Sequence, residues 1–129
     1  FVKTMLRLMQ EKSELSVIYD QIGTPTWAHS LALWLWDIAM KPNVTGIYHW
    51  TDAGVASWYD FAIAIQELAL EKGLLNKEIP ILPIPAIAYP TPAKRPVFSL
   101  MDKSSAQSVS DVGNIYWRKQ LSKMLDELM

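Results

Sequence analysis

Two adjacent cations in a proline-rich segment are the residues of this sequence best suited to chemistry. The segment spans residues 89–96, and Lys94 and Arg95 are its only charged residues. Each proline fixes its own φ angle at about −65° and pushes the preceding residue toward extended geometry, so we expect a stiff ribbon. Arginine offers a planar fork of donors that suits phosphate, and lysine adds a compact charge. An anion clamp is one interpretation. A surface loop with two solvated cations is the other, and composition alone favours it.

The patterns of self-contained catalysis are missing. The five glycines stand too far apart to form a glycine-rich phosphate loop. No tyrosine is followed four residues later by lysine, and no Gly-x-Ser-x-Gly motif occurs. His29 and His49 fall on a predicted helix and a predicted strand without neighbouring ligands, so we expect no metal site and interpret both as surface or packing residues.

Six tryptophans offer a second kind of chemistry, which is stacking on a sugar or a base. Trp34 and Trp117 fit the buried stripes of predicted helices, where packing is the usual role. Trp27, Trp50 and Trp58 flank predicted loops and are the better binding candidates. For these three as well, packing remains the commoner role of a tryptophan.

The composition indicates one globular domain. The chain has 129 residues, of which 50% are hydrophobic, and a formal net charge of −1. A pI near 6.1 argues against a general nucleic-acid or membrane-surface binder, so any bound anion must be held locally. The absence of cysteine excludes disulfides and thiolate chemistry and agrees with the reducing cytoplasm, where we place the protein.

The beginning of the chain indicates a piece of a longer polypeptide. Apolar residues recur at helical spacing from Phe1 to Met9, with no initiator methionine, signal peptide or N-cap residue ahead of them. We therefore interpret residues 1–129 as a single C-terminal domain of a longer protein.

Periodicity, caps and prolines predict a mixed α/β domain of helices and short strands. We expect helices over residues 1–9, 27–40, 58–72, 102–107 and 115–128, and strands over residues 15–19, 46–50 and 79–84. Residues 46–50 lack apolar/polar alternation, which is typical of a strand buried on both faces of a parallel sheet. Prolines restrict residues 79–84 to an edge strand. Thr26 is expected to cap the second helix, Ser57 and Asp60 to form a capping box, and Gly73 to end the third helix.

Three segments, in their order and spacing, resemble the C-terminal part of the dTDP-4-dehydrorhamnose reductases, a family of extended short-chain dehydrogenases/reductases. They are residues 20–26, residues 46–50 followed by 57–62, and residues 89–96 leading to 99–102. The opening residues 1–5 and the pair Trp117 and Arg118 agree as well. The resemblance covers nearly the whole chain.

The resemblance implies a Rossmann region ahead of Phe1 that carries the glycine-rich NAD(P)H loop and the catalytic Tyr-x-x-x-Lys. This chain would then be a C-terminal α/β lobe from which the Rossmann core is mostly absent. The implied reaction reduces dTDP-4-dehydro-L-rhamnose to dTDP-L-rhamnose with NADPH or NADH. This chain would hold the dTDP-sugar, contribute no catalytic residue and bind no cofactor by itself.

The resemblance also assigns expected roles to four residues. Arg95 would grip the diphosphate, Lys94 would add charge, and Gln21 together with residues 23–26 would line the nucleotide-sugar cleft. Tyr89 would stack on a base or sugar, or pack under the ribbon. A tight turn and a helix cap explain residues 23–26 equally well without a ligand.

Two other functions stay open from the sequence. One is a non-catalytic relative that resembles the regulatory subunit of methionine adenosyltransferase and works by binding a partner. The other is a structural fragment without ligand affinity. If residues 46–50 ended the Rossmann sheet, their unpaired edge would also favour a homo-oligomer.

Overall fold

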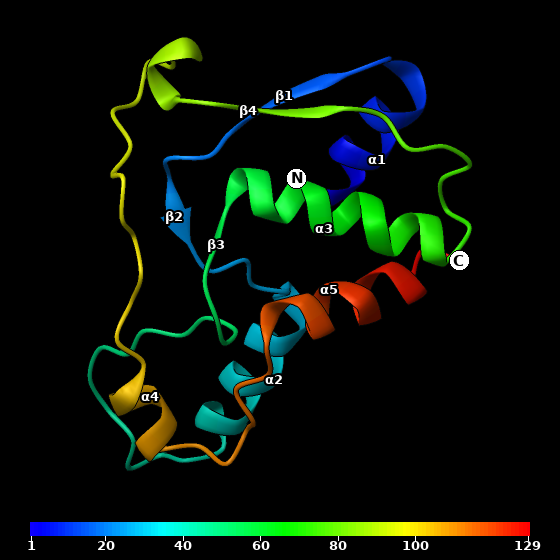
Figure 1. Ribbon diagram of the computed structural model, residues 1–129. Helices are drawn as coiled ribbons and strands as arrows, with labels where there is room; N and C mark the ends of the chain where they lie inside the picture. The colour runs from blue at the N-terminus through cyan, green and yellow to red at the C-terminus, as the bar shows by residue number, and fades with distance from the viewer.

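Helix α3 (Trp58–Glu71) is the central element of the computed structural model, which describes residues 1–129. It contacts α1, α5 and the strands β1, β3 and β4. Figure 1 shows α3 between the β1–β4 pair and α5, with α2 and α4 at the opposite end of the molecule. The remaining elements are α1 (Val2–Glu11), β1 (Leu15–Ile18), β2 (Ile22–Gly23), α2 (Ala28–Ala39), β3 (Ala56–Ser57), β4 (Ile81–Ile84), a 3-10 turn (Ala86–Ala88), α4 (Ser104–Ser108) and α5 (Trp117–Asp126). The predicted mixed α/β class is confirmed.

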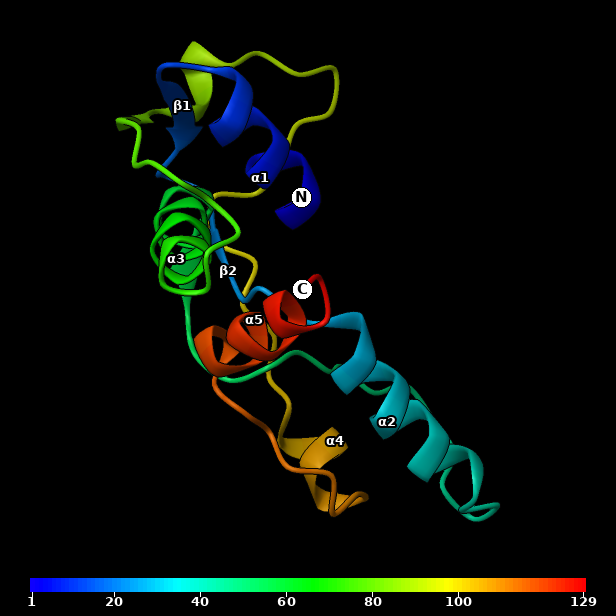
Figure 2. The same ribbon diagram turned by 90° about the vertical axis from the view of Figure 1, so that its right-hand side faces the viewer.

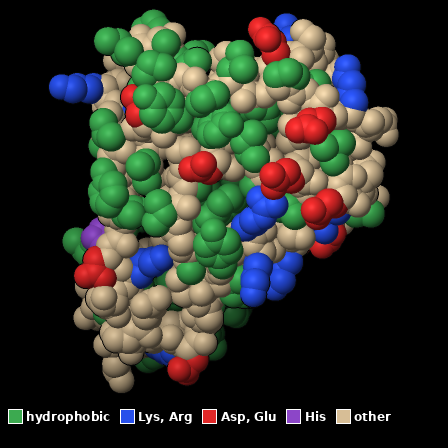
Figure 3. All heavy atoms as spheres, viewed as in Figure 1, with side chains coloured by type: hydrophobic (Ala, Val, Ile, Leu, Met, Phe, Trp, Pro, Cys, Tyr) green, Lys and Arg blue, Asp and Glu red, His purple; other side chains and the backbone are tan.

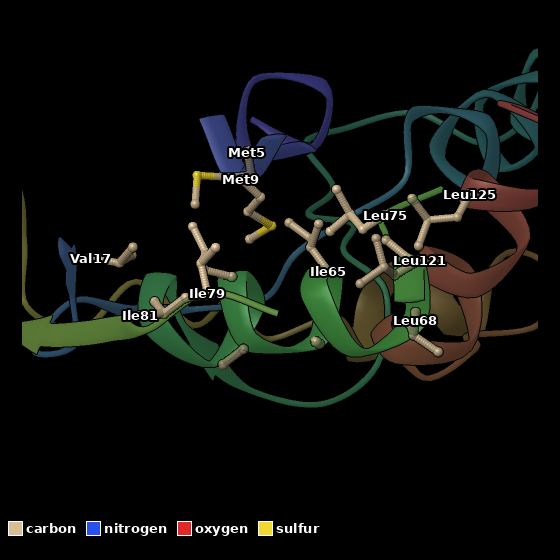
Figure 4. Close-up of a cluster of buried hydrophobic side chains, with 14 of the residues drawn as sticks. Met5, Met9, Val17, Ile65, Leu68, Leu75, Ile79, Ile81, Leu121 and Leu125 are labelled. Carbon is tan, nitrogen blue, oxygen red and sulfur yellow. The ribbon is translucent and has the colours of Figure 1, made fainter. Parts of the chain in front are cut away.

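The main core lies around the buried side of α3. Ile65 is fully buried on this helix, and burial of such a side chain contributes roughly 1.5–3 kcal/mol. Methionines of α1 and leucines of α5 meet it from two directions (Figure 4). The cluster includes Met5, Met9, Val17, Ile65, Leu68, Leu75, Ile79, Ile81, Trp117, Leu121 and Leu125. All three helices were predicted from their apolar spacing.

The strands form two separate pairs. β1 and β4 run parallel, with Leu15 opposite Ile81 and Ile18 opposite Ile84. The predicted edge strand over residues 79–84 is confirmed over its last four residues. β2 and β3 pair antiparallel through Ile22 and Ser57. This second pair is short, but it brings the chain before α2 against the start of α3.

Residues 46–50 are not a strand, and this prediction was wrong. Gly46 has φ +118° and Ile47 is 88% exposed, so the segment turns along the surface. Only Trp50 is buried, and its ring stacks on Trp34 of α2 at 5.6 Å between centroids. Together with Ala106 of α4 these rings form a second, smaller core. In Figure 2 α2 and α4 lie together, away from α1 and β1. Residues 46–50 therefore provide no strand edge for self-association.

The predicted helix caps are present at α3, but the cap predicted for α2 is not. Ser57 and Asp60 form the complete capping box, and Gly73 adopts φ +74° after the helix. The predicted cap by Thr26 was wrong. The carboxylate of Asp52 reaches the start of α2 and accepts the backbone N–H of Trp27 at 2.9 Å. Thr26 Oγ1 instead accepts the backbone N–H of Asp52 at 3.2 Å.

Smaller differences concern helix ends and faces. α5 begins at Trp117, two residues later than predicted. Leu35 next to the buried Trp34 is 53% exposed, because only one narrow face of α2 meets the second core. Ahead of α4, the carboxylate of Asp102 accepts the hydroxyl and the backbone N–H of Ser104, which hold the pKa of Asp102 below its ordinary value. None of the helices has the length and hydrophobicity that a bilayer-spanning segment requires.

Candidate functional site: two joined cavities

Backbone hydrogen bonds place the end of the proline-rich segment against β2. The N–H of Ile22 donates to the carbonyl of Val97 at 2.8 Å, and the N–H of Ser99 donates to the carbonyl of Ile22 at 2.9 Å. A Cβ on Gly23 would lie 2.8 Å from Ser99 Oγ, so this close approach suits glycine. Arg95 is thereby fixed beside the loop that carries Gln21.

The β2–β3 pair brings a third segment to the same place. Ser57 lies opposite Ile22, so Trp58, the first residue of α3, stands next to this loop. The capping box fixes the start of α3 because the Ser57 N–H donates to the Asp60 carboxylate at 2.8 Å and the Asp60 N–H donates to Ser57 Oγ at 3.0 Å. Gln21, Trp58 and Arg95 thus come from three separate parts of the sequence.

Two cavities meet at these three residues. The smaller has a volume of about 290 Å³ and the larger about 860 Å³, and Gln21, Trp58 and Arg95 line both. The smaller cavity lies between β2, β3 and the end of the proline-rich segment. The larger lies between α1, β1 and the start of that segment. Figure 3 shows hydrophobic side chains gathered on the surface over α3 and the β1–β4 pair.

All four residues expected at the site line the larger cavity: Gln21, Tyr89, Lys94 and Arg95. Tyr89 is 61% exposed, so its ring does not pack beneath the ribbon. Lys94 and Arg95 are exposed and belong to none of the ion pairs of the chain, whereas Arg7, Lys41, Lys72 and Arg118 each pair with a carboxylate. The loop residues Gly23, Thr24 and Pro25 line the smaller cavity. Thr26 does not line either of the two.

An aromatic trio borders the cavities. The ring of Phe1 lies 4.9 Å from that of Trp58 and 5.3 Å from that of Phe61, between centroids. Trp58 was one of the three predicted stacking candidates. Phe1 and Phe61 both fall within predicted helices, and no local pattern distinguishes a cavity wall from a core face. The site therefore combines two free cations, a free amide and exposed aromatic rings, which suits a ligand with an anionic centre and flat ends.

The other candidates lie elsewhere. Trp50 is buried against Trp34, so it is a packing residue. Trp27 stacks on His29 at 4.5 Å and lines a third cavity, between α1, α5 and the start of α2. His29 Nδ1 lies 3.9 Å from Glu127 Oε1, and His49 is exposed. No group of three or more acidic or histidine side chains is arranged to hold a metal ion.

The site lacks the glycine-rich turn at a helix N-terminus that binds the pyrophosphate of a dinucleotide in a Rossmann domain. Its one glycine, Gly23, faces Ser99.

Comparison with known proteins agrees with the predicted resemblance. The family model described as "RmlD substrate binding domain" matches residues 1–129. The dTDP-4-dehydrorhamnose reductase of Escherichia coli (strain K12) is 40% identical, and the match covers 99% of this chain and 44% of that protein. The spore coat polysaccharide biosynthesis protein SpsK of Bacillus subtilis (strain 168) is 37% identical, with 98% and 42% covered.

Solved structures share the fold. A dTDP-4-dehydrorhamnose reductase from Clostridium acetobutylicum ATCC 824 has a TM-score of 0.88 at 34% identity, covering 99% of this chain and 43% of that one. The enzyme from Bacillus anthracis str. Ames, in complex with NADP, has a TM-score of 0.86 at 30% identity, with 98% and 43% covered. The chain thus spans less than half the length of these relatives and corresponds to their C-terminal part. With a family model matched from its first residue to its last, the chain belongs to the RmlD substrate binding domain family.

Proposed function

We propose that this chain is the substrate-binding domain of a dTDP-4-dehydrorhamnose reductase and holds the dTDP-sugar in the two joined cavities. The observation that carries the proposal is the meeting of Gln21, Tyr89, Lys94 and Arg95 around one cavity, with both cations free of acidic partners. Arg95 binds the diphosphate through its guanidinium, and Lys94 adds a second positive charge at the rim.

The whole protein, in this proposal, reduces dTDP-4-dehydro-L-rhamnose to dTDP-L-rhamnose with NADPH. Support comes from relatives named as reductases and from the relative whose structure contains NADP. An N-terminal Rossmann domain supplies the cofactor site and the Tyr-x-x-x-Lys pair, which the residues of this chain do not provide. We place the protein in the cytoplasm, because proteins in this reducing compartment rarely depend on disulfides and this chain has no cysteine.

The regulatory-subunit alternative has no support in these relatives, which are named for reductase activity and polysaccharide biosynthesis. It makes a distinct prediction for the longer protein. NADPH oxidation that depends on dTDP-4-dehydro-L-rhamnose supports the reductase. A longer protein that lacks Tyr-x-x-x-Lys and oxidises no NADPH would contradict it.

We also propose that the protein forms a homo-oligomer, and the basis is an exposed apolar surface of α2 in place of a strand edge at residues 46–50. Leu33 and Trp36 lie on one face of α2, Met40 follows at its C-terminal end, and all three are more than half exposed. An apolar patch of this kind is typical of an interaction surface.

Binding by this chain is tested by titration with dTDP in a calorimeter. We expect weak binding, with a Kd in the upper micromolar to millimolar range, because the Rossmann domain supplies further contacts in the longer protein. Thymidine without phosphates should bind still more weakly, because it lacks the anionic centre. No heat with millimolar dTDP would contradict substrate binding and favour a purely structural chain.

A further inference from the structure

We propose that Asp20 is a positioning residue for the proline-rich segment, because its carboxylate holds the start of the loop that carries this segment while Ile22 holds the end. The inference rests on the proposed function, since Lys94 and Arg95 serve that function from this loop. It assigns no ligand contact to Asp20, which lines none of the three cavities.

The backbone pairing of β1 with β4 ends just before the proline-rich segment. The last backbone hydrogen bond of this pair runs from the N–H of Tyr19 to the carbonyl of Ile84 at 3.0 Å. Pro85 comes next and has no N–H to donate. From this point on, the chain after β4 stays beside β1 only if a side chain holds it there.

The side chain of Asp20 provides this contact. Its Oδ1 atom accepts the N–H of Ala86 at 2.8 Å, across 66 residues of sequence. This N–H is the first of the 3-10 turn, and Pro85 ahead of the turn gives it no side-chain cap. Hydrogen bonds to a carboxylate are roughly twice as strong as those between neutral groups. The bond therefore fixes the start of the turn and with it Tyr89, which follows the turn directly.

The other end of the loop is held two residues further along the same stretch of chain. The N–H of Ile22 donates to the carbonyl of Val97 at 2.8 Å. The loop from Ala86 to Val97 is thus attached at both ends to residues 20–22, with Gln21 between the two attachments. A surface loop of this length with both ends at one place is an Ω-loop.

Between the two attachments, no other hydrogen bond joins the loop to the rest of the chain. Residues 87–96 are exposed, and their hydrogen-bond partners all lie within residues 85–93. In Figure 1 the loop runs along one side of the molecule. Its prolines keep the backbone extended and stiff, so a displacement at either end carries along to Lys94 and Arg95. The positions of both cations therefore depend on the two attachments, of which only the one through Asp20 uses a side chain.

Amide hydrogen exchange, followed by mass spectrometry, tests the attachment without a ligand. Asp20→Ala should speed exchange in the peptide that contains residues 85–89 roughly 10-fold, because the N–H of Ala86 loses its acceptor. Peptides from α3 should exchange as in the unmodified chain. Glu14→Ala is the matched control, because Glu14 lies just before β1 as Asp20 lies just after it, is exposed and makes no hydrogen bond.

Calorimetry with dTDP tests the consequence for binding. Asp20→Ala should raise the Kd roughly 2- to 10-fold, since the ligand must then order the freed start of the loop. Asp20→Asn keeps a side-chain oxygen as acceptor and should restore most of the affinity. The pair of variants also separates position from charge, because loss of a negative charge near an anion site would by itself strengthen dTDP binding in both.

The outcomes separate this inference from the proposed function. Failure of the unmodified chain to bind dTDP overturns the proposed function and the inference with it. Normal binding by the unmodified chain, combined with an unchanged Kd for Asp20→Ala or tighter binding by both variants, overturns only the role of Asp20. Unchanged exchange of residues 85–89 in Asp20→Ala overturns the attachment itself. Circular dichroism of each variant confirms that it is folded.

Discussion

The carboxylate of Asp52 caps helix α2 from a distance of 25 residues along the chain, accepting the backbone N–H of Trp27 at 2.9 Å. Its other oxygen accepts the Ser30 hydroxyl at 2.6 Å, and the residue is 1% exposed. A buried carboxylate at a helix N-terminus satisfies free N–H groups and complements the helix dipole. This contact holds the loop of residues 23–26, and with it one side of the smaller cavity, against the second core.

Replacement of Asp52 by alanine should therefore destabilise the protein. We expect the free energy of unfolding to fall by about 1–3 kcal/mol, because the change removes the cap and leaves the Trp27 N–H without its acceptor. Urea unfolding monitored by circular dichroism measures this loss. Asp111→Ala is the matched control, since Asp111 is exposed and makes no side-chain hydrogen bond. Equal stabilities of the two variants would contradict the capping role.

Three glycines differ in how strongly the structure restricts a side chain at their position, so alanine should destabilise the protein to a different extent at each. Gly54 has φ +94°, and a Cβ there would collide with the ring of Tyr116 and lie 2.9 Å from Trp117 Cδ1. Gly73 has φ +74° but open space around it, and Gly113 has neither constraint. We expect alanine to cost about 2–4 kcal/mol at Gly54, about 1 kcal/mol at Gly73 and nearly nothing at Gly113. Thermal unfolding measures the series, and a different rank order would show that the Tyr116 ring yields easily.

Asp37 should make stability depend on pH in the acid range. Hydrogen bonds from Lys41 Nζ at 2.8 Å and from Ser110 Oγ at 2.6 Å hold the pKa of Asp37 below its ordinary value of 3.8. A carboxyl whose pKa is lower in the folded state stabilises the protein above the unfolded pKa. That stabilisation disappears as the pH falls through the folded value.

The corresponding measurement compares Asp37→Asn with the unmodified chain by urea unfolding at pH 6 and at pH 2.5. The variant should be less stable at pH 6, and the difference should shrink at pH 2.5, because the stabilisation by the ionised carboxyl decreases once the pH falls below the ordinary pKa of 3.8. A difference that is constant with pH would mean that the ionised form of Asp37 adds nothing.

The exposed face of α2 should support self-association. Sedimentation velocity over a wide range of concentrations should show a rising mean mass for the unmodified chain, because burial of Leu33, Trp36 and Met40 favours contact between copies. The double variant Leu33→Lys, Met40→Lys should stay monomeric. A clean monomer for the unmodified chain at all concentrations would exclude this role of α2.

The sequence predicted local structure better than contacts between distant segments. α3 was predicted with both its ends, because Ser57, Asp60 and Gly73 act through neighbours three or four residues away. The lack of apolar/polar alternation in residues 46–50 predicts a strand buried on both faces. The structure instead buries only Trp50 against Trp34, a contact across 16 residues that no local pattern contains.

For the candidate site, too, the sequence predicted individual residues better than the contacts that bring them together. Lys94 and Arg95 stood out by their charge and their prolines, and Gln21 and Tyr89 were carried over from the family resemblance. The cavities themselves depend on the pairing of Ile22 with Val97 and Ser99 and of β2 with β3, which the sequence did not reveal. The place of Phe1 and Phe61 at the site could therefore be recognised only from the structure.

The most direct test of the proposed diphosphate contact is the affinity of dTDP for Arg95→Ala, measured by calorimetry beside Arg7→Ala. Arg7 is an exposed arginine of α1 that pairs with Glu11 and lines none of the three cavities described above. Loss of a charged hydrogen bond costs roughly 1.5–3 kcal/mol, so Arg95→Ala should raise the Kd about 10- to 150-fold, while Arg7→Ala leaves it unchanged. In a full-length reductase the same change should appear mainly in KM. An equal Kd for Arg95→Ala and the unmodified chain would contradict the assignment of Arg95 to the diphosphate.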